Sequence, residues 1–267
     1  MTHERKLRVL DLFSGIGGFS LGLERTGGFE TVAFCEIEEY PRKVLEKHWP
    51  DVPIYKDVRN VTGERLATDG IAVDVITGGF PCQDLSSAGQ RAGIYGERSG
   101  LWGEIIRIMG DVQPRFMLFE NVAGLLTGNG GRWFDRLLTD LASIGYDLQW
   151  ECISAAQLGA PHIRERVYGI AHPSKNGRVC LQPKADPSFP RNVGDNIGPN
   201  WRDSGLGDWF DWAATIKGKK ISGEPIIARK DDGVSGWVDR NSALGNAVVP
   251  QIPEMIGYAI LEAENGR

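Results

Sequence analysis

Short apolar runs alternate with amphipathic stretches over the first 172 residues of the chain. Apolar runs of this length predict buried strands, and the intervening stretches have the apolar spacing of helices. Strands are predicted at residues 8–13, 30–37, 72–79, 115–122 and 166–172, and helices at 17–28, 38–48, 99–112 and 132–144. This alternation is typical of an α/β domain with a mixed, mostly parallel sheet of Rossmann-like type.

The pattern changes near residue 173, where Pro, Gly, Asn and Asp become frequent and no periodicity is visible. Residues 243–264 are again apolar and helical, as if the chain returned to its first part. We therefore predict one domain from residues 1–172, completed by 241–267, and a small irregular lobe at 173–240.

The composition favours a folded globular protein and speaks against a membrane protein or a metal- or disulfide-stabilised one. With 267 residues and 41% hydrophobic residues the chain is large enough to bury a core, and no apolar run reaches the length of a signal peptide or membrane span. We expect a cytoplasmic protein without membrane contact. The four cysteines form no C-x-x-C pair, which speaks against a zinc site and against a disulfide framework, and no metal is predicted.

The net charge of −5 does not by itself suggest a nucleic-acid partner. Between Arg164 and Arg240, however, the chain has 13 Lys and Arg against 10 Asp and Glu. This asymmetry permits a lobe that faces a polyanion.

A glycine-rich turn follows the first predicted strand, in "DLFSGIGGFSLGL". Gly15 and Gly17 stand where a strand passes into a helix, so a ligand can approach the backbone near the helix N-terminus. Glu36, at the end of the second strand, can accept hydrogen bonds from ribose hydroxyls, and Asp57 can lie near an adenine amino group. Glycine turns also serve packing alone, but together these residues favour an adenosyl ligand.

Cys82 differs from Cys35, Cys152 and Cys180, which suit buried apolar positions. It follows Pro81 in "GGFPCQDLSSAG", in a polar loop at the predicted carboxyl edge of the sheet, where a thiol can act as a nucleophile.

Glu120 ends the next strand on the same edge, and burial of such a carboxylate is costly unless it is paired or protonated. Arg164 and Arg166 are two residues apart on an extended segment and point the same way. One or both can hold an anionic or carbonyl oxygen.

The motifs "DLFSGIGG", "GGFPCQDLSSAG", "ENV", "RERVYGIA" and "ALGNAVVP" occur in this order. The set resembles the ordered motifs of the DNA cytosine-5 methyltransferases, over roughly residues 1–172 and 240–260. The sequence departs from the family at His162, where the family has a glutamine before the Arg-x-Arg pair.

The resemblance implies a methyltransferase fold and methyl transfer from S-adenosylmethionine to C5 of cytosine. Cys82 is then the nucleophile that adds to C6, Glu120 shares a proton with N3, and Arg164 and Arg166 bind O2 or position Glu120 and a phosphate. The implied cofactor contacts are Phe13, Gly15, Gly17, Glu36, Asp57, Pro81 and Asn246.

The implied partner is double-stranded DNA, from which the target cytosine must be flipped out. Ser86 and Ser87 lie in the loop expected to close over the base, and 173–240 becomes the target-recognition region. Within it, Thr215 is a candidate base-reading residue, and Lys217, Lys219 and Lys220 are candidate phosphate contacts. A monomer is expected, and the family leaves room for a cognate restriction endonuclease.

Three alternatives stay open at this point. The same chemistry can act on transfer RNA, as in one branch of the family. A dinucleotide-dependent oxidoreductase would use the glycine turn and Glu36 but leaves Cys82 and Glu120 without a role. A non-enzymatic nucleic-acid-binding protein on an inactive methyltransferase scaffold has no reason to keep the catalytic set intact.

Overall fold

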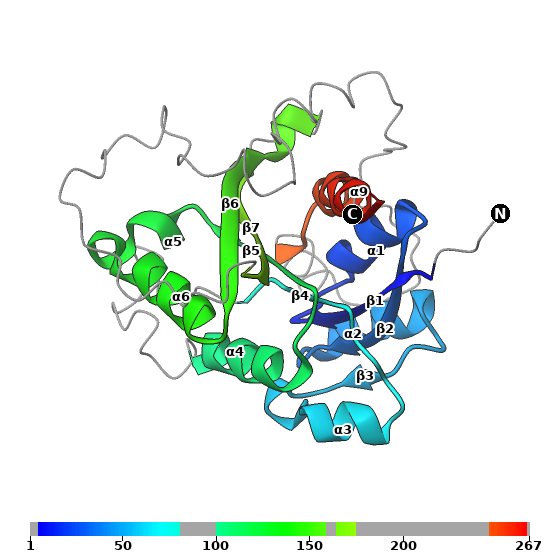
Figure 1. Ribbon diagram of the computed structural model, residues 1–267. Coiled ribbons are helices and arrows are strands. Elements are labelled where there is room, and N and C mark those ends of the chain that lie inside the picture. The colour runs from blue at the N-terminus through cyan, green and yellow to red at the C-terminus, as the bar shows by residue number, and fades with distance from the viewer. Residues whose placement is uncertain (1–4, 81–99, 159–163, 175–245, 266–267) are drawn as a thin grey trace.

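A computed structural model of the chain describes residues 5–80, 100–158, 164–174 and 246–265 (Figure 1). The described strands are β1 (Leu7–Leu12), β2 (Phe29–Cys35), β3 (Ile54–Tyr55), β4 (Val75–Gly78), β5 (Phe116–Val122), β6 (Tyr146–Ser154) and β7 (Glu165–Pro173). The described helices are α1 (Gly18–Arg25), α2 (Glu39–His48), α3 (Gly63–Thr68), α4 (Gly100–Val112), α5 (Gly124–Thr127), α6 (Arg132–Ser143) and α9 (Gln251–Asn265), with 3-10 turns η1 (Val58–Asn60), η4 (Gly128–Gly131) and η5 (Ala155–Leu158).

The strands form one sheet in the order β3-β2-β1-β4-β5-β7-β6. The pairs from β3 to β5 are parallel, and β7 runs antiparallel to both of its neighbours. The chain proceeds from β1 outward to β3 and then returns to place β4 on the other side of β1. The carboxyl ends of β1 and β4 therefore mark the switch point of the sheet, the place at which ligands bind in doubly wound sheets. The predicted mixed, mostly parallel α/β sheet is confirmed.

β6 was not predicted. Its sequence "YDLQWECIS" mixes polar and apolar residues, and most of its side chains are only partly buried. Among the described strands, β6 lies at the end of the sheet and pairs with β7 alone, and polar side chains suit such an edge strand.

Each face of the sheet packs against its own helices (Figure 1). Alternation along β1 directs Val9 to the face covered by α1 and α9, and Leu10 and Leu12 to the face covered by α4 and α6. The two cores on either side hold the strand ends rigidly, which matters because the strand ends carry the candidate site.

α9 packs directly on α1. A Cβ atom at Gly22 would collide with the carbonyl oxygen of Pro250, and Arg25 forms an ion pair with the buried Glu254 at 3.6 Å. The segment after residue 246 thus supports the helix that begins at the glycine turn. The predicted lobe at 173–240 lies almost wholly outside the described residues, so the division into two units stays a prediction.

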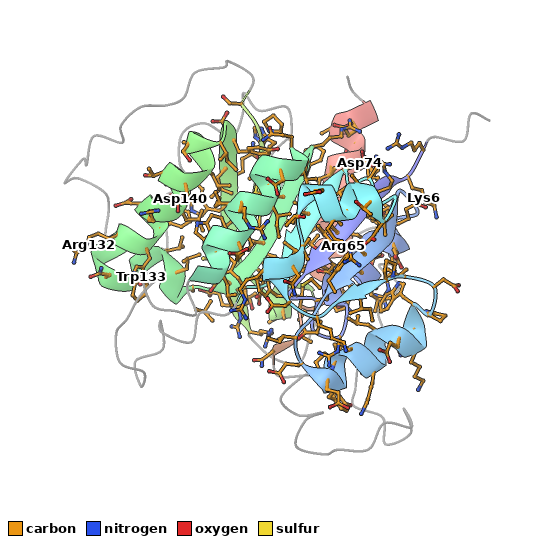
Figure 2. All side chains as sticks on the ribbon, turned by 90° about the horizontal axis from the view of Figure 1, so that it is seen from below. Lys6, Arg65, Asp74, Arg132, Trp133 and Asp140 are labelled. Carbon is orange, nitrogen blue, oxygen red and sulfur yellow. The ribbon has the colours of Figure 1, made fainter. Side chains whose placement is uncertain are left out.

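At their amino ends, β1 and β4 are joined by Arg8 and Asp74. Oδ2 of Asp74 accepts hydrogen bonds from the backbone N–H of Arg8 at 3.0 Å and from its Nε at 2.8 Å. Figure 2 shows Asp74 on the side of the molecule opposite Arg132 of α6. This connection fixes the two strands at the edge remote from the switch point.

Candidate active site

The glycine turn between β1 and α1 has an unusual backbone. Phe13, Gly15 and Gly17 all have positive φ angles, of 53°, 53° and 84°. A Cβ atom at Gly15 would meet no atom within 4 Å among the described residues, whereas one at Gly17 would lie 2.7 Å from the Trp49 ring. Gly15 therefore borders open space that a ligand can use, and Gly17 serves close packing against α2 and Trp49.

Glu36 closes the turn from the end of β2. Its side chain is buried, with Oε2 accepting a hydrogen bond from the N–H of Gly15 and Oε1 one from the N–H of Glu38, both at 2.7 Å. Burial raises the pKa of Glu36, and the backbone hydrogen bonds oppose this shift. Each carboxylate oxygen has a second lone pair, so the group can still accept bonds from ribose hydroxyls.

Ile37 is a residue that the sequence prediction missed. Its apolar side chain is 64% exposed directly after Glu36. Nη1 of Arg42 donates hydrogen bonds to the carbonyl oxygens of Glu36 and Ile37 and so anchors this strand end. An exposed isoleucine beside a carboxylate that can accept hydrogen bonds from a ribose suits contact with a flat heterocycle.

Asp57 lies two residues after β3, next to the end of β2. Its carboxylate caps η1 and accepts hydrogen bonds from the backbone and guanidinium of Arg59, which lower its pKa. The position matches the predicted edge, but the carboxylate is already paired, so a contact with an adenine amino group stays a prediction.

Phe80 leads from β4 toward Pro81 and is held at two points. Its ring packs on Trp102 and Phe119 with centroid distances of 5.2 and 6.1 Å, and its carbonyl oxygen accepts a hydrogen bond from Nδ2 of Asn121 at 3.2 Å. Asn121, also missed from the sequence, thereby fixes the entry to the next segment of chain.

Glu120 is buried at the end of β5. Its Oε1 lies 3.2 Å from Nε of Arg166 and 3.8 Å from Nη2 of Arg164. A Cβ atom at Gly79 would lie 3.7 Å from Oε2, so the carboxyl group borders the start of the segment that leads to Cys82. Burial raises the pKa of Glu120, while the charges of Arg164 and Arg166 oppose the shift. Such a carboxyl group can exchange a proton closer to neutrality than an ordinary glutamate.

Asn246 is exposed and begins the returning segment. Two residues later, the backbone of Val248 lies against Gly18, and its side chain is 4.0 Å from a Cβ built on Gly79. The segment therefore passes between the glycine turn and the end of β4, on the predicted edge.

The remaining candidate positions lie outside the described residues. They are Pro81, Cys82, Ser86, Ser87, His162, Thr215, Lys217, Lys219 and Lys220.

Asp11 was also missed. It is fully buried in β1 and accepts hydrogen bonds from Thr77 of β4 and Ser20 of α1. Burial raises its pKa to about 7, and the bonds from Thr77 and Ser20 oppose this shift. The signal was present in the sequence as a lone acidic residue inside the apolar run "RVLDLF".

Of the described cysteines, Cys35 is buried and Cys152 is half-buried. Cys35 and Cys152 form no disulfide, and burial raises the pKa of Cys35 to about 12 and that of Cys152 to about 11. Among the residues that the structure describes, no cluster of acidic, His or Cys side chains could hold a metal ion, and no helix has the length and apolar character for a membrane crossing.

A doubly wound sheet with a glycine turn after β1 and a carboxylate at the end of β2 defines an α/β protein of the nucleotide-cofactor-binding class. The family description "C-5 cytosine-specific DNA methylase" matches residues 7–204. The chain belongs to that family.

Among its curated relatives, Type II methyltransferase M.BsuFI of Bacillus subtilis is 34% identical over 183 residues, covering 68% of this chain and 43% of the relative. Type II methyltransferase M1.HphI of Haemophilus parahaemolyticus is 33% identical over 197 residues, covering 72% and 52%. The chain thus spans about half the length of the curated relatives it matches.

Solved structures agree on the fold. A protein described as a DNA modification methyltransferase encoded within an E. coli prophage superposes with a TM-score of 0.54 at 29% identity, covering 63% of this chain and 47% of the other. Spodoptera frugiperda DNMT2 superposes with a TM-score of 0.52 at 22% identity, covering 64% and 51%, and supports the fold alone.

Proposed function

We propose that this protein transfers a methyl group from S-adenosylmethionine to C5 of cytosine in double-stranded DNA, with Cys82 as the nucleophile. The observation that supports the proposal is that two groups of residues lie at strand ends on either side of the β1–β4 switch point. Gly15 and Glu36 form the half suited to an adenosyl ligand, and Glu120 with Arg164 and Arg166 forms the half suited to proton exchange with a base.

The residues present fit the cofactor. Gly15 borders open space, Glu36 has free lone pairs for the ribose hydroxyls, and Ile37 offers an exposed apolar surface. S-adenosylmethionine supplies the methyl group as an electrophile. Phe13 at the turn places an aromatic ring where a sulfonium cation would be favoured.

The substrate base must be activated, because cytosine C5 is a poor nucleophile. The Cys82 thiolate adds to C6, so that an S–C6 bond forms and the electron pair of the C5–C6 double bond becomes available at C5. Glu120 shares its proton with N3 and so limits the negative charge on the ring. The electron pair at C5 would then form the bond to the methyl group, the methyl–sulfur bond would break, and S-adenosylhomocysteine would leave. A base then removes the C5 proton, the S–C6 bond breaks and the thiolate is restored.

The remaining predicted residues serve DNA binding. Ser86 and Ser87 belong to the loop that closes over the flipped base. Thr215 reads a base edge in the recognition region, and Lys217, Lys219 and Lys220 bind phosphates. The relatives are named Type II methyltransferases, so a restriction–modification setting is part of the proposal.

A covalent trap tests the proposal. Duplex DNA containing 5-fluorocytosine should form an adduct with the wild-type protein and S-adenosylmethionine, because fluorine cannot leave C5 as a proton does. Cys82→Ser should form none, since a serine alkoxide is not accessible at neutral pH. An adduct in the variant would assign another nucleophile.

Two parallel measurements separate the alternatives. Bisulfite sequencing of DNA and of transfer RNA from expressing cells identifies the substrate, and the proposal requires new 5-methylcytosine in DNA. Calorimetry should show binding of S-adenosylmethionine and not of NAD. Preferential NAD binding would favour the oxidoreductase.

A further inference from the structure

Asp11 joins three elements beneath the site. It stands opposite Thr77 in the register of β1 and β4. Its Oδ1 accepts a hydrogen bond from Oγ1 of Thr77 at 2.7 Å, and its Oδ2 accepts one from Oγ of Ser20 in α1 at 2.8 Å. All three residues are fully buried. The two hydroxyls therefore share one carboxyl group that water does not reach.

Other contacts also hold β1 against β4. β1 and β4 are already paired along Val9–Leu12 and joined at their amino ends by Arg8 and Asp74. The same face holds Val9 and Val75, so an apolar side chain at residue 11 would have apolar neighbours. Buried polar clusters of this kind can be replaced by apolar residues at little cost in stability. Unlike apolar contacts, hydrogen bonds depend on angle, so they fix the orientation of the two groups that they join.

The two hydroxyls lead to different halves of the site. Thr77 comes two residues before Gly79, which borders the carboxyl group of Glu120, and three before the anchored Phe80. Ser20 lies in the first turn of α1, directly after the glycine turn that Glu36 closes. Asp11 is thus the one described side chain bonded to both the helix that follows the cofactor turn and the strand that leads to Cys82.

We propose that Asp11, through Thr77 and Ser20, is a positioning residue that holds the end of β4 and the cofactor turn in alignment. Thr77 sets the direction in which β4 ends, and Ser20 sets the start of α1. The inference rests on the proposed function. A displacement of about 1 Å at a reacting atom is enough to lower a rate by as much as about 100-fold. Loss of the hydrogen bonds of Asp11 should therefore have a large effect on the rate, although Asp11 does not touch the reacting atoms.

Two assays measure the catalytic half and the cofactor half of the site separately. Cofactor-free release of tritium from DNA labelled at cytosine C5 reports thiolate addition: the S–C6 bond forms, a solvent proton adds at C5, and the label leaves as the S–C6 bond breaks. Calorimetry with S-adenosylmethionine reports the cofactor half. Thr77→Val, which keeps the shape of the side chain but removes its hydroxyl, should slow tritium release about 10-fold or more while cofactor Kd stays within about twofold.

Ser20→Ala should show the opposite pattern, with cofactor Kd raised about 10-fold and tritium release retained. Thr77→Ser restores the hydroxyl and should recover at least half of the wild-type release rate, whereas a purely spatial role of the threonine methyl group would leave it impaired.

Two variants provide matched controls. Thr31→Val makes the same substitution on β2, at a buried hydroxyl without a hydrogen-bond partner among the described residues. Asp74→Asn weakens the other connection between β1 and β4. Both variants should keep the wild-type rate of tritium release and the wild-type Kd for S-adenosylmethionine. Both quantities are corrected for the fraction of folded protein, which thermal unfolding measures.

The inference is overturned if Thr77→Val and Ser20→Ala match the wild type per folded molecule. It is equally overturned if both lower rate and affinity together, since that is the result of a merely structural role. Failure of the proposed function looks different, because the wild-type protein itself would then release no tritium.

Discussion

Nε of Arg166 lies 3.2 Å from Oε1 of Glu120, across the antiparallel pair of β7 and β5. Both side chains are largely buried, and Arg164 approaches the same oxygen to 3.8 Å. Burial favours the neutral carboxyl group, and the two guanidinium groups favour the anion. The protonation state of Glu120 therefore depends on the balance between burial and the two arginine charges, and substitution of Glu120 or of either arginine should change it.

Glu120→Gln should lower methyl transfer by about 100- to 10,000-fold, because glutamine keeps the shape but cannot deliver a proton. Cofactor Kd should be nearly unchanged. In the wild-type protein the rate should fall as pH rises through the raised pKa of Glu120, and the variant should lack this limb. Single-turnover rates from pH 5 to 9 check this, and unaltered turnover would remove Glu120 from the mechanism.

Arg166→Gln removes the nearer cation, so the pKa of Glu120 should rise further and the alkaline limb of the rate profile should move to higher pH. Arg132→Gln is the control, since Arg132 is an exposed residue at the start of α6 and donates hydrogen bonds to Asn129 and not to Glu120. A profile that does not move would show that Arg166 serves the base or phosphate instead.

Glu36→Gln should raise the Kd for S-adenosylmethionine by about 10- to 150-fold, the equivalent of about 1.5–3 kcal/mol for a lost charged acceptor. In the wild type each carboxylate oxygen of Glu36 accepts a hydrogen bond from a backbone N–H group. In the variant one of these oxygens is replaced by an NH2 group, which is a donor and cannot accept that bond. Glu39→Gln, on an exposed residue of α2, should leave Kd unchanged. Calorimetry measures both, and DNA affinity without cofactor should not change in either variant.

Asp11→Asn tests the buried carboxyl group through stability. The pKa of Asp11 is raised from 3.8 to about 7. Between these values the folded protein keeps a proton that the unfolded chain releases, so this group's contribution to stability falls as pH rises from about 4 to 7. The loss approaches about 1.4 kcal/mol per pH unit within that window and stops above it.

The variant carries no titrating group at this position, so its unfolding free energy should depend less on pH across the same window. Denaturant titrations at pH 4.5, 6 and 7.5 measure the difference. Glu36, Glu120 and Glu254 also have raised pKa values, but they are common to both proteins and cancel in the comparison. Parallel curves would mean that Asp11 is ionised in the folded state throughout.

The strand ends could be read from the sequence because buried parallel strands are continuous apolar runs. "RFMLFENV" placed Glu120 at the edge of the sheet, and "ETVAFCEI" placed Glu36. The contacts of Asp11 could not be read, because they depend on the register between β1 and β4, which are separated by two other strands in the chain. The role of Asn121 was hidden for the same reason, since its partner Phe80 follows the neighbouring strand β4.

The packing of α9 on α1 has a consequence for biosynthesis. Roughly 225 residues separate Arg25 from Gln251, and at about 5–20 residues per second a ribosome needs roughly 10–45 s to add them. Throughout that time the side of α1 that includes Gly22 and Leu23 lacks the helix that later covers it. The nascent chain therefore completes the cover of α1 only after nearly the whole chain has been made.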